Sequence, residues 1–278
     1  MPHGGTSSES DESQGLAHGF DTDGTVLDDV RHVLFVHAHP DDETLATGAL
    51  MAELIDRDIL VTLVTCTRGE RGEVVPGPLS HLQGMPEFAA HRENELAGAL
   101  AELGVTRHVW LGTPPARVAQ LEPRRYEDSG MRWVREGLAG PAADASANAL
   151  TSQPLADETA DLLAFVDAAH TAPDLVVSYN EIGGYGHPDH MRARKVAEAA
   201  ARARGIRFAE ILSDAALAQK AQDAGELATW FHLDHRLDQV KAALAHHASQ
   251  VSVDGDDVVH SGGQRTPIGT SVGLRLVL

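Results

Sequence analysis

Two imidazoles and three consecutive carboxylates lie together in the stretch HAHPDDE (37–43), directly after the apolar run VLFV. Such a cluster of acids repels itself unless a cation neutralises it. His39 and Asp42 are three residues apart, and side chains at this spacing share one face of a helical turn. They could therefore bind one divalent metal, with Pro40 fixing the turn and Asp41 left free to act as a base.

A second histidine-rich stretch, NEIGGYGHPDH (180–190), follows another apolar run and precedes a helical pattern. Its two histidines, His187 and His190, repeat the three-residue spacing. Turns that follow parallel strands meet at one end of a sheet, so we expect the two stretches to come together. Three protein ligands with an open position for water form the catalytic pattern of zinc.

Each motif also has an ordinary explanation. Acidic residues at a helix start cap it and complement its dipole, and single histidines more often pack than bind metal. The two motifs in matching contexts favour a metal site over these alternatives. The single cysteine, Cys66, ends an apolar run and has no histidine beside it, which predicts a packed thiol and not a nucleophile. The glycines near residue 184 lack the strand–loop–helix context of a nicotinamide site.

The elements that must position these motifs alternate along the chain. Strands are predicted over 31–37, 59–66, 107–111, 174–179 and 207–212. Helices are predicted over 43–57, 88–104, 155–171, 188–204 and 234–249. Apolar strands separated by helices predict an α/β fold, a mostly parallel Rossmann-like sheet with helices on both faces, in a single domain.

Charge and composition narrow the classes of partner. The net charge of −19 argues against nucleic acid or an anionic membrane as the main partner. Apolar runs stay well short of the roughly 20 residues that cross a membrane, and the first residues lack the pattern of a secretory signal. One cysteine excludes an internal disulfide and suits a reducing compartment. We therefore expect a soluble, cytoplasmic protein; its oligomeric state is left open.

Four intervals fit the alternating pattern poorly. Residues 1–30 hold seven acids and neither lysine nor arginine, which predicts a disordered acidic tail before a domain over 31–278. The interval 112–154 is long for a connection and predicts a functional loop. The interval 213–232 could be helical or irregular, and 253–278 could supply a strand or hairpin.

The paired motifs AHPDDE and HPDH resemble those of the zinc-dependent N-acetylglucosaminyl deacetylases of the LmbE/PIG-L family. The resemblance runs from about residue 31 into the C-terminal region. The stretches TCTRGERGEV, RENELAGALAELGV, DSGM, GGYGHPDH and AHHASQV are most similar to the branch that acts in mycothiol biosynthesis. That branch removes acetate from N-acetylglucosaminyl-inositol.

The resemblance implies a set of metal ligands and a base. The ligands would be His39, Asp42 and His190, holding Zn²⁺ or Fe²⁺. Asp41 would be the general base that takes a proton from water at the metal. The resulting enzyme would be an amidohydrolase that acts on a linear amide of a small amino sugar.

The same resemblance implies three further catalytic residues. His187 would stabilise the oxyanion or protonate the departing amine, and Asp189 would orient that imidazole through a hydrogen bond. Tyr185 matches a tyrosine that polarises the amide carbonyl, although a packed loop aromatic is the alternative.

Substrate-binding residues are implied at three positions outside the metal motifs. Arg92 and Asp128 match residues that contact sugar or inositol hydroxyls. Glu73, in the glycine-rich RGERGEV loop, could also line the pocket or form an ordinary surface contact. His247 and Gln250 match positions that we expect in the pocket wall.

Two rival functions remain at this point. A mycothiol S-conjugate amidase would use the same metal turns, but Gly186 stands where that branch tends to carry proline. A non-catalytic glycan-binding protein would lack the base or a ligand, and all four of these residues are present. The chain also departs from the family by Glu181-Ile182 in place of Pro-Asn, and by a short 213–232 interval.

Overall fold

The computed structural model describes residues 24–135 and 138–278. Its main sheet has the strand order β3-β2-β1-β6-β7-β12-β8. The strands are β1 (His32–His37), β2 (Leu60–Thr65), β3 (His108–Trp110), β6 (Leu175–Ser178), β7 (Arg207–Leu212), β12 (Ser271–Leu276) and β8 (Ala228–His232). The first five in this order are parallel, and β12 and β8 are antiparallel to their neighbours. The predicted mostly parallel α/β sheet is therefore confirmed.

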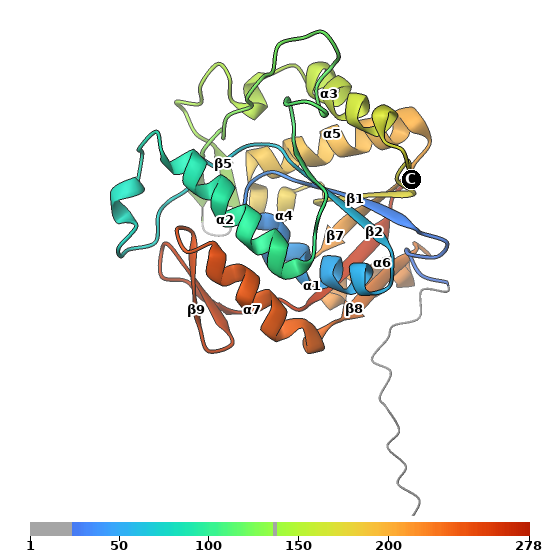
Figure 1. Ribbon diagram of the computed structural model, residues 1–278. Helices are drawn as coiled ribbons and strands as arrows, with labels where there is room; N and C mark the ends of the chain where they lie inside the picture. The colour runs from blue at the N-terminus through green and yellow to red at the C-terminus, as the bar shows by residue number, and fades with distance from the viewer. Residues whose placement is uncertain (1–23, 136–137) are drawn as a thin grey trace, which may run out of the picture.

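Helices cover both faces of this sheet (Figure 1). One layer contains α1 (Asp42–Asp56), α2 (Phe88–Leu103) and α7 (Leu237–His246), and the other contains α3 (Leu155–Ala168) and α5 (Pro188–Arg204). Side chains of a strand alternate between its two faces. Accordingly, Val33 and Phe35 of β1 pack in one core cluster, whereas Leu34 and Val36 pack in the other.

Shorter elements fill the intervals that the sequence left open. The remaining strands are β4 (Met131–Arg135), β5 (Leu138–Pro141), β9 (Val251–Asp254), β10 (Asp257–His260) and β11 (Arg265–Pro267). The remaining helices are α4 (Gly183–Gly186), α6 (Ala215–Asp223), η1 (Ser80–Leu82), η2 (Leu150–Ser152) and η3 (Asp234–Arg236). The undecided interval 213–232 thus contains α6 and strand β8, and 253–278 contributes both a small sheet and β12.

The prediction of an acidic tail over residues 1–30 is wrong at its inner end. Residues 1–23 lie outside the described residues, so the prediction there is untested. Val26, Leu27 and Val30 are buried in the core cluster beneath α1, which contradicts a solvated tail as far as residue 30. Burial of each of these apolar side chains stabilises the fold by about 1.5–3 kcal/mol. This free energy outweighs the preference of the neighbouring acidic residues for water.

Within the described part of the chain, every helix is too short or too polar to span a lipid bilayer.

Candidate metal centre

The two histidine-rich turns meet because β1 and β6 are adjacent parallel strands. β1 leads into the turn before α1, and β6 leads into the turn before α5. Tyr179, directly after β6, joins them: its hydroxyl accepts a hydrogen bond from the amide of Ala38 at 2.9 Å. Its ring also stacks on His190, with centroids 4.2 Å apart and planes at 8°. The sequence did not single out Tyr179; its only signal was an aromatic residue at the end of a predicted strand.

The predicted ligands His39, Asp42 and His190 lie together around one carboxylate. Asp42 Oδ2 is 3.1 Å from His39 Nδ1, and Asp42 Oδ1 is 3.1 Å from His190 Nε2. Both imidazoles are buried. The three groups therefore direct two nitrogens and a carboxylate toward one region, as a shared cation requires.

The outer contacts of the two imidazoles fix which nitrogen can bind a metal. His190 Nδ1 lies 3.1 Å from the carbonyl oxygen of Gly183, so Nδ1 carries the proton and Nε2 carries a lone pair. That Nε2 atom is buried and lies 3.1 Å from Asp42 Oδ1, but it does not have the geometry of a hydrogen bond to any described residue. His39 Nε2 lies 3.2 Å from Asp189 Oδ2, which leaves Nδ1 facing Asp42. Metal-binding histidines use this arrangement, so these residues fit a divalent cation.

The surrounding ionisable groups determine the charges of His39 and Asp42. Burial disfavours a charged imidazole, but Asp128, Asp189 and Asp42 outweigh it and raise the pKa of His39 well above its usual value. Burial likewise opposes ionisation of Asp42, but His190 and His39 hold its pKa well below the usual range. The cluster therefore favours positive charge between its acids, which either a proton or a divalent metal ion supplies.

Ligand atoms also come within 4.8 Å of one another in two overlapping groups of the described residues, His39–His187–His190 and His39–Asp128–Asp189. Neither group includes Asp42, and the first contains His187 in its place. We favour Asp42 as the ligand because its carboxylate faces both imidazoles and supplies the negative charge. His187 Nδ1 accepts a hydrogen bond from the amide of Asp189 at 3.2 Å, so the proton of the neutral ring resides on Nε2. A protonated nitrogen donates a hydrogen bond and does not bind metal.

His187 is held neutral by its surroundings. Burial, together with the nearby rings of His39 and His190, lowers the pKa of His187 to about 2. Its ring lies 4.7 Å from that of His39 and 4.6 Å from that of His190, centroid to centroid. The structure thus places a neutral N–H donor beside the candidate metal ligands.

Asp189 has a different contact from the one predicted. Its carboxylate accepts hydrogen bonds from the amide of Ser129 at 2.8 Å and from His39, whereas only its backbone amide contacts His187. The expected side-chain hydrogen bond from Asp189 to His187 is therefore wrong. The physical reason is that His187 is the N-cap of α5 and accepts its hydrogen bond from the backbone amide of Asp189, which leaves the carboxylate free to contact the candidate ligand His39.

Asp41 is held in an unusual backbone conformation beside the ligands, with φ 114° and ψ −35°. Such a conformation costs about 1–3 kcal/mol and persists only when neighbours enforce it. Its amide donates to Glu43 Oε2 at 2.9 Å, and its carboxylate lies 3.2 Å from the Arg92 guanidinium. Burial raises the pKa of Asp41 to about 6, although Arg92 opposes the shift.

Arg92 is nearly inaccessible, with 2% of its surface exposed. Its guanidinium donates to the carbonyl oxygens of Gly69 and Pro40 as well as pairing with Asp41. These contacts position the Asp41 turn. Contact of Arg92 with substrate, as the sequence implied, stays a prediction.

A second buried pair supports the same turn and was missed at the level of sequence. Glu43 and His247 are both fully buried and lie 2.8 Å apart, Oε1 to Nε2. The position of His247 in a pocket wall, as the sequence implied, stays a prediction. The proximity of two residues 204 positions apart has no local sequence signal.

The other implied residues lie at different distances from this centre. Asp128 is buried, anchored by the amide of Gly130 at 2.7 Å, and its Oδ1 is 3.8 Å from His39 Nε2. Tyr185 is 41% exposed, with its ring centroid 5.4 Å from that of His190. Burial and nearby carboxylates raise the pKa of Tyr185, so its hydroxyl remains a donor.

Glu73, in contrast, is exposed, and its carboxylate accepts a hydrogen bond from Ser261 beside β10 at 3.2 Å. Its predicted role in substrate binding is untested. Cys66 is buried, as predicted, and burial raises the pKa of its thiol.

Residues 34–201 match the protein family described as PIG-L, GlcNAc-PI de-N-acetylase. A relative from Nocardioides sp., named 1D-myo-inositol 2-acetamido-2-deoxy-alpha-D-glucopyranoside deacetylase, is 43% identical over 62% of this chain and 54% of its own length. A relative of the same name from Actinosynnema mirum is 37% identical over 74% of this chain and 67% of its own length. The chain spans about half the length of the first curated relatives it matches.

Solved structures share the fold at low sequence identity. The A40926 pseudoaglycone deacetylase Dbv21 has a TM-score of 0.56 at 21% identity, covering 90% of this chain and 98% of its own. The zinc-inhibited form of teicoplanin deacetylase Orf2 has a TM-score of 0.57 at 19% identity, covering 88% and 98%. At this identity the likeness concerns the fold.

Proposed function

We propose, from the membership of this chain in the PIG-L family of GlcNAc-PI de-N-acetylases, that it is a metal-dependent deacetylase of N-acetylglucosaminyl-inositol. The observation that carries the proposal is the buried lone pair of His190 Nε2, which lies 3.1 Å from one oxygen of Asp42 without forming a hydrogen bond, while the other oxygen of Asp42 faces His39. The names of the relatives support the substrate. A cytoplasmic step of mycothiol biosynthesis is the setting we infer.

His39 Nδ1, His190 Nε2 and Asp42 would hold the ion. A donor set of two imidazoles and a carboxylate suits zinc and also iron(II), of which we propose zinc. Such an ion would polarise the acetamide carbonyl and make a neighbouring water a usable nucleophile at neutral pH. Asp189 would keep the His39 ring in the required tautomer through its Nε2 hydrogen bond.

Asp41 would act first as the general base. Its carboxylate takes a proton from the attacking water, whose oxygen forms the new bond to the carbonyl carbon. A pKa of about 6 suits this task, because the group is ionised at neutral pH and still basic enough to accept the proton. The strained turn, held by Glu43 and Arg92, fixes where that carboxylate points.

Two donors would stabilise the oxyanion. His187 offers a neutral Nε2–H, and Tyr185 offers its hydroxyl from the rim of the centre. The carbon–nitrogen bond then breaks, acetate leaves, and the amine recovers a proton. Protonated Asp41 can return the proton it received, because the low pKa of His187 makes that imidazole a poor store of protons.

The test is a hydrolysis assay on the purified, zinc-loaded protein. N-acetylglucosaminyl-inositol and a mycothiol S-conjugate are incubated separately, with and without a chelator, and the released amine is quantified. We expect chelator-sensitive release from the first substrate and little from the second. Release from the S-conjugate alone would favour the amidase instead, and absent or chelator-insensitive release from both would contradict a metal-dependent amide hydrolase.

A further inference from the structure

A large aromatic side chain lies exposed just outside the metal centre. Trp133, on strand β4, is 57% exposed, and the nearby loop before α5 exposes Tyr185 as well. Tryptophan is large and apolar, and exposed apolar surface beside a polar centre commonly marks a ligand-binding site. The mechanism proposed above uses Tyr185 but gives Trp133 no task.

The position of the Trp133 ring is defined relative to the ligands. Its centroid lies 5.9 Å from that of Tyr185, with the planes tilted by 34°. The Tyr185 centroid lies 5.4 Å from that of His190 and 6.0 Å from that of His187. Tyr185 is therefore in ring contact both with Trp133 and with the two histidines of the centre.

The strand that carries Trp133 is anchored to the same centre. β5, its hairpin partner, contacts both α4 and α5, the helices that carry Tyr185 and His190. Ala139, which pairs with Trp133 across the hairpin, is buried. The pairing register shifts between Trp133 and Arg135, and irregularities of this kind are common beside active sites, where they re-aim a side chain. The ring is thus supported from the protein side and open to solvent on the other.

We propose that the exposed face of Trp133 binds the second ring of the substrate, a saturated and hydroxylated six-membered ring joined to the amino sugar. The inference rests on the proposed function, which places the acetamide at the metal ligands and the amino-sugar ring beside Tyr185. The ring attached to that sugar then lies one ring-width farther out, over Trp133.

The chemistry of such a ring suits this surface. A saturated polyol ring carries its hydroxyl groups mainly around its rim and presents C–H groups on its faces. The face of an indole is electron-rich and apolar, so it attracts C–H groups while the rim hydroxyls stay in water. Trp133 would therefore select substrates by the presence of a second ring and not by the acetamide.

Kinetics on two substrates test the proposal with the zinc-loaded full chain. The first substrate is N-acetylglucosaminyl-inositol, and the second is the methyl glycoside of N-acetylglucosamine, which lacks the second ring. We expect Trp133→Ala to raise KM for the two-ring substrate about tenfold, as loss of one aromatic stack would, while kcat changes little. KM for the methyl glycoside should stay within about twofold in the same variant.

Two further variants separate stacking from damage to the hairpin. Trp133→Phe keeps an aromatic face and should recover most of the affinity for the two-ring substrate. Val134→Ala removes an exposed apolar side chain, 61% exposed, from the same strand and should leave both substrates unaffected. Equal effects of Trp133→Ala on the two substrates, or no effect on either, would overturn the proposal.

Failure of the proposed function would be recognised separately. If the wild-type protein hydrolyses neither substrate, the proposed deacetylation is wrong. Binding of the second ring to Trp133 is then tested by calorimetry with glucosaminyl-inositol. Weaker binding to Trp133→Ala than to the wild type would support a contact between the ligand and Trp133, and equal binding would overturn the proposal. A dimer in the wild type that Trp133→Ala dissociates without changing KM or binding would assign the ring to a protein interface and would also overturn it.

Discussion

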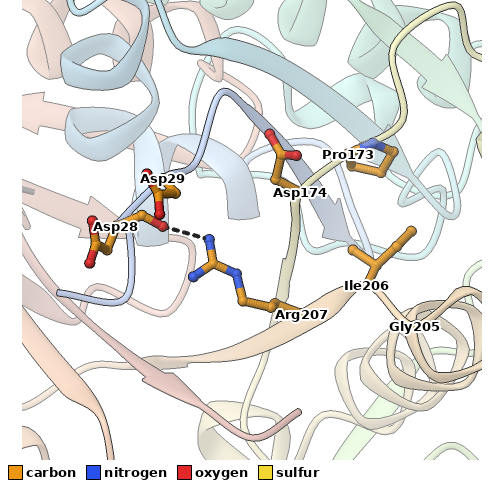
Figure 2. Close-up of a pocket in the computed structure, with 7 residues that line it drawn as sticks. All are labelled: Asp28, Asp29, Pro173, Asp174, Gly205, Ile206 and Arg207. Atoms are coloured by element: carbon orange, nitrogen blue, oxygen red, sulfur yellow. Dashed lines mark hydrogen bonds between the residues drawn. The ribbon is translucent and has the colours of Figure 1, made fainter. Parts of the chain in front are cut away.

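Strands β1 and β6 have acidic clusters at both of their ends, and the two ends differ in chemistry. Beyond the amino ends lies an open hollow of about 480 Å³ lined by Asp28, Asp29, Asp174 and Arg207, together with a few uncharged residues (Figure 2). Beyond the carboxyl ends lies the candidate metal centre. Both contain several carboxylates within a short distance.

At the amino ends the polar groups satisfy one another. Asp174 Oδ2 accepts hydrogen bonds from the amides of Arg31 and His32 at 2.9 and 3.0 Å. Arg207 donates to the carbonyl oxygen of Asp28 at 2.9 Å, as Figure 2 shows. At the carboxyl ends the buried lone pair of His190 Nε2 lies 3.1 Å from Asp42 Oδ1 and, among the described residues, forms no hydrogen bond. A density of acids therefore does not define a site; unsatisfied buried lone pairs do.

The largest expected effect follows from removing one of those lone pairs. His190→Ala should abolish stoichiometric zinc binding and lower kcat/KM by at least about a thousandfold, because the ion then loses one of three protein ligands. Elemental analysis and the amine-release assay measure the two effects. The control is His81→Ala, which removes an exposed histidine that belongs to neither motif. Full zinc content in His190→Ala would remove this residue from the ligand set.

The next effect separates the base from the ligands. Asp41→Asn should keep zinc but lower kcat by about a hundredfold to ten-thousandfold, since an amide cannot accept the proton of water. The matched control is Asp29→Asn in the amino-end hollow, because Asp29 also has a positive φ, 58°. That variant should keep full activity. An Asp41→Asn enzyme with normal kcat would show that another group acts as base.

Much of the fold and of the metal centre could be predicted because their signals are local. Apolar runs of four to six residues separated by helical patterns predicted five parallel strands in nearly their observed positions. The spacing of His39 and Asp42 placed two ligands on one turn. The meeting of the two turns at one end of the sheet follows from the rule for the carboxyl ends of parallel strands, whereas the adjacency of β1 and β6 is visible only in the structure.

The features that were missed depend on long-range packing. Nothing near Glu43 indicates that His247 lies against it, and nothing in the acidic stretch indicates that the core begins at Val26. The carboxylate of Asp189 turned toward His39 because the amide of Ser129, in a distant loop, supplies its second hydrogen bond. These contacts arise only when the layers of the fold have assembled.

A smaller effect should distinguish Asp189 from Asp174. Both carboxylates accept hydrogen bonds from backbone amides, but they lie at opposite ends of the sheet. Asp189→Asn should weaken zinc binding about tenfold to a hundredfold, because the His39 tautomer loses its anionic partner. Asp174→Asn should leave zinc affinity unchanged and affect only stability. Competition with a chromophoric chelator gives both affinities. Equal losses would mean that the Asp189 contact has no special influence on the metal ligand.

The smallest effect concerns His32, which occupies the amino end of the strand that leads to His39. Its nitrogens lie 3.0 Å from the carbonyl oxygen of Thr171 and 2.9 Å from the hydroxyl of Thr62, and burial lowers its pKa below 6.5. A lowered folded-state pKa gives stability that is present above pH 6.5 and is lost as the pH falls through the folded value.

His32→Gln cannot titrate, so its loss of stability relative to the wild type should shrink between pH 7.5 and pH 5, by less than about 1 kcal/mol. Urea unfolding of both proteins in the presence of a chelator isolates this contribution from metal binding. A difference in the free energy of unfolding that stays constant over this range would mean that His32 has an ordinary pKa. The pKa of His32 would then not be lowered by burial. The contrast between His32 and His39, at the two ends of β1, would depend only on their hydrogen-bond partners.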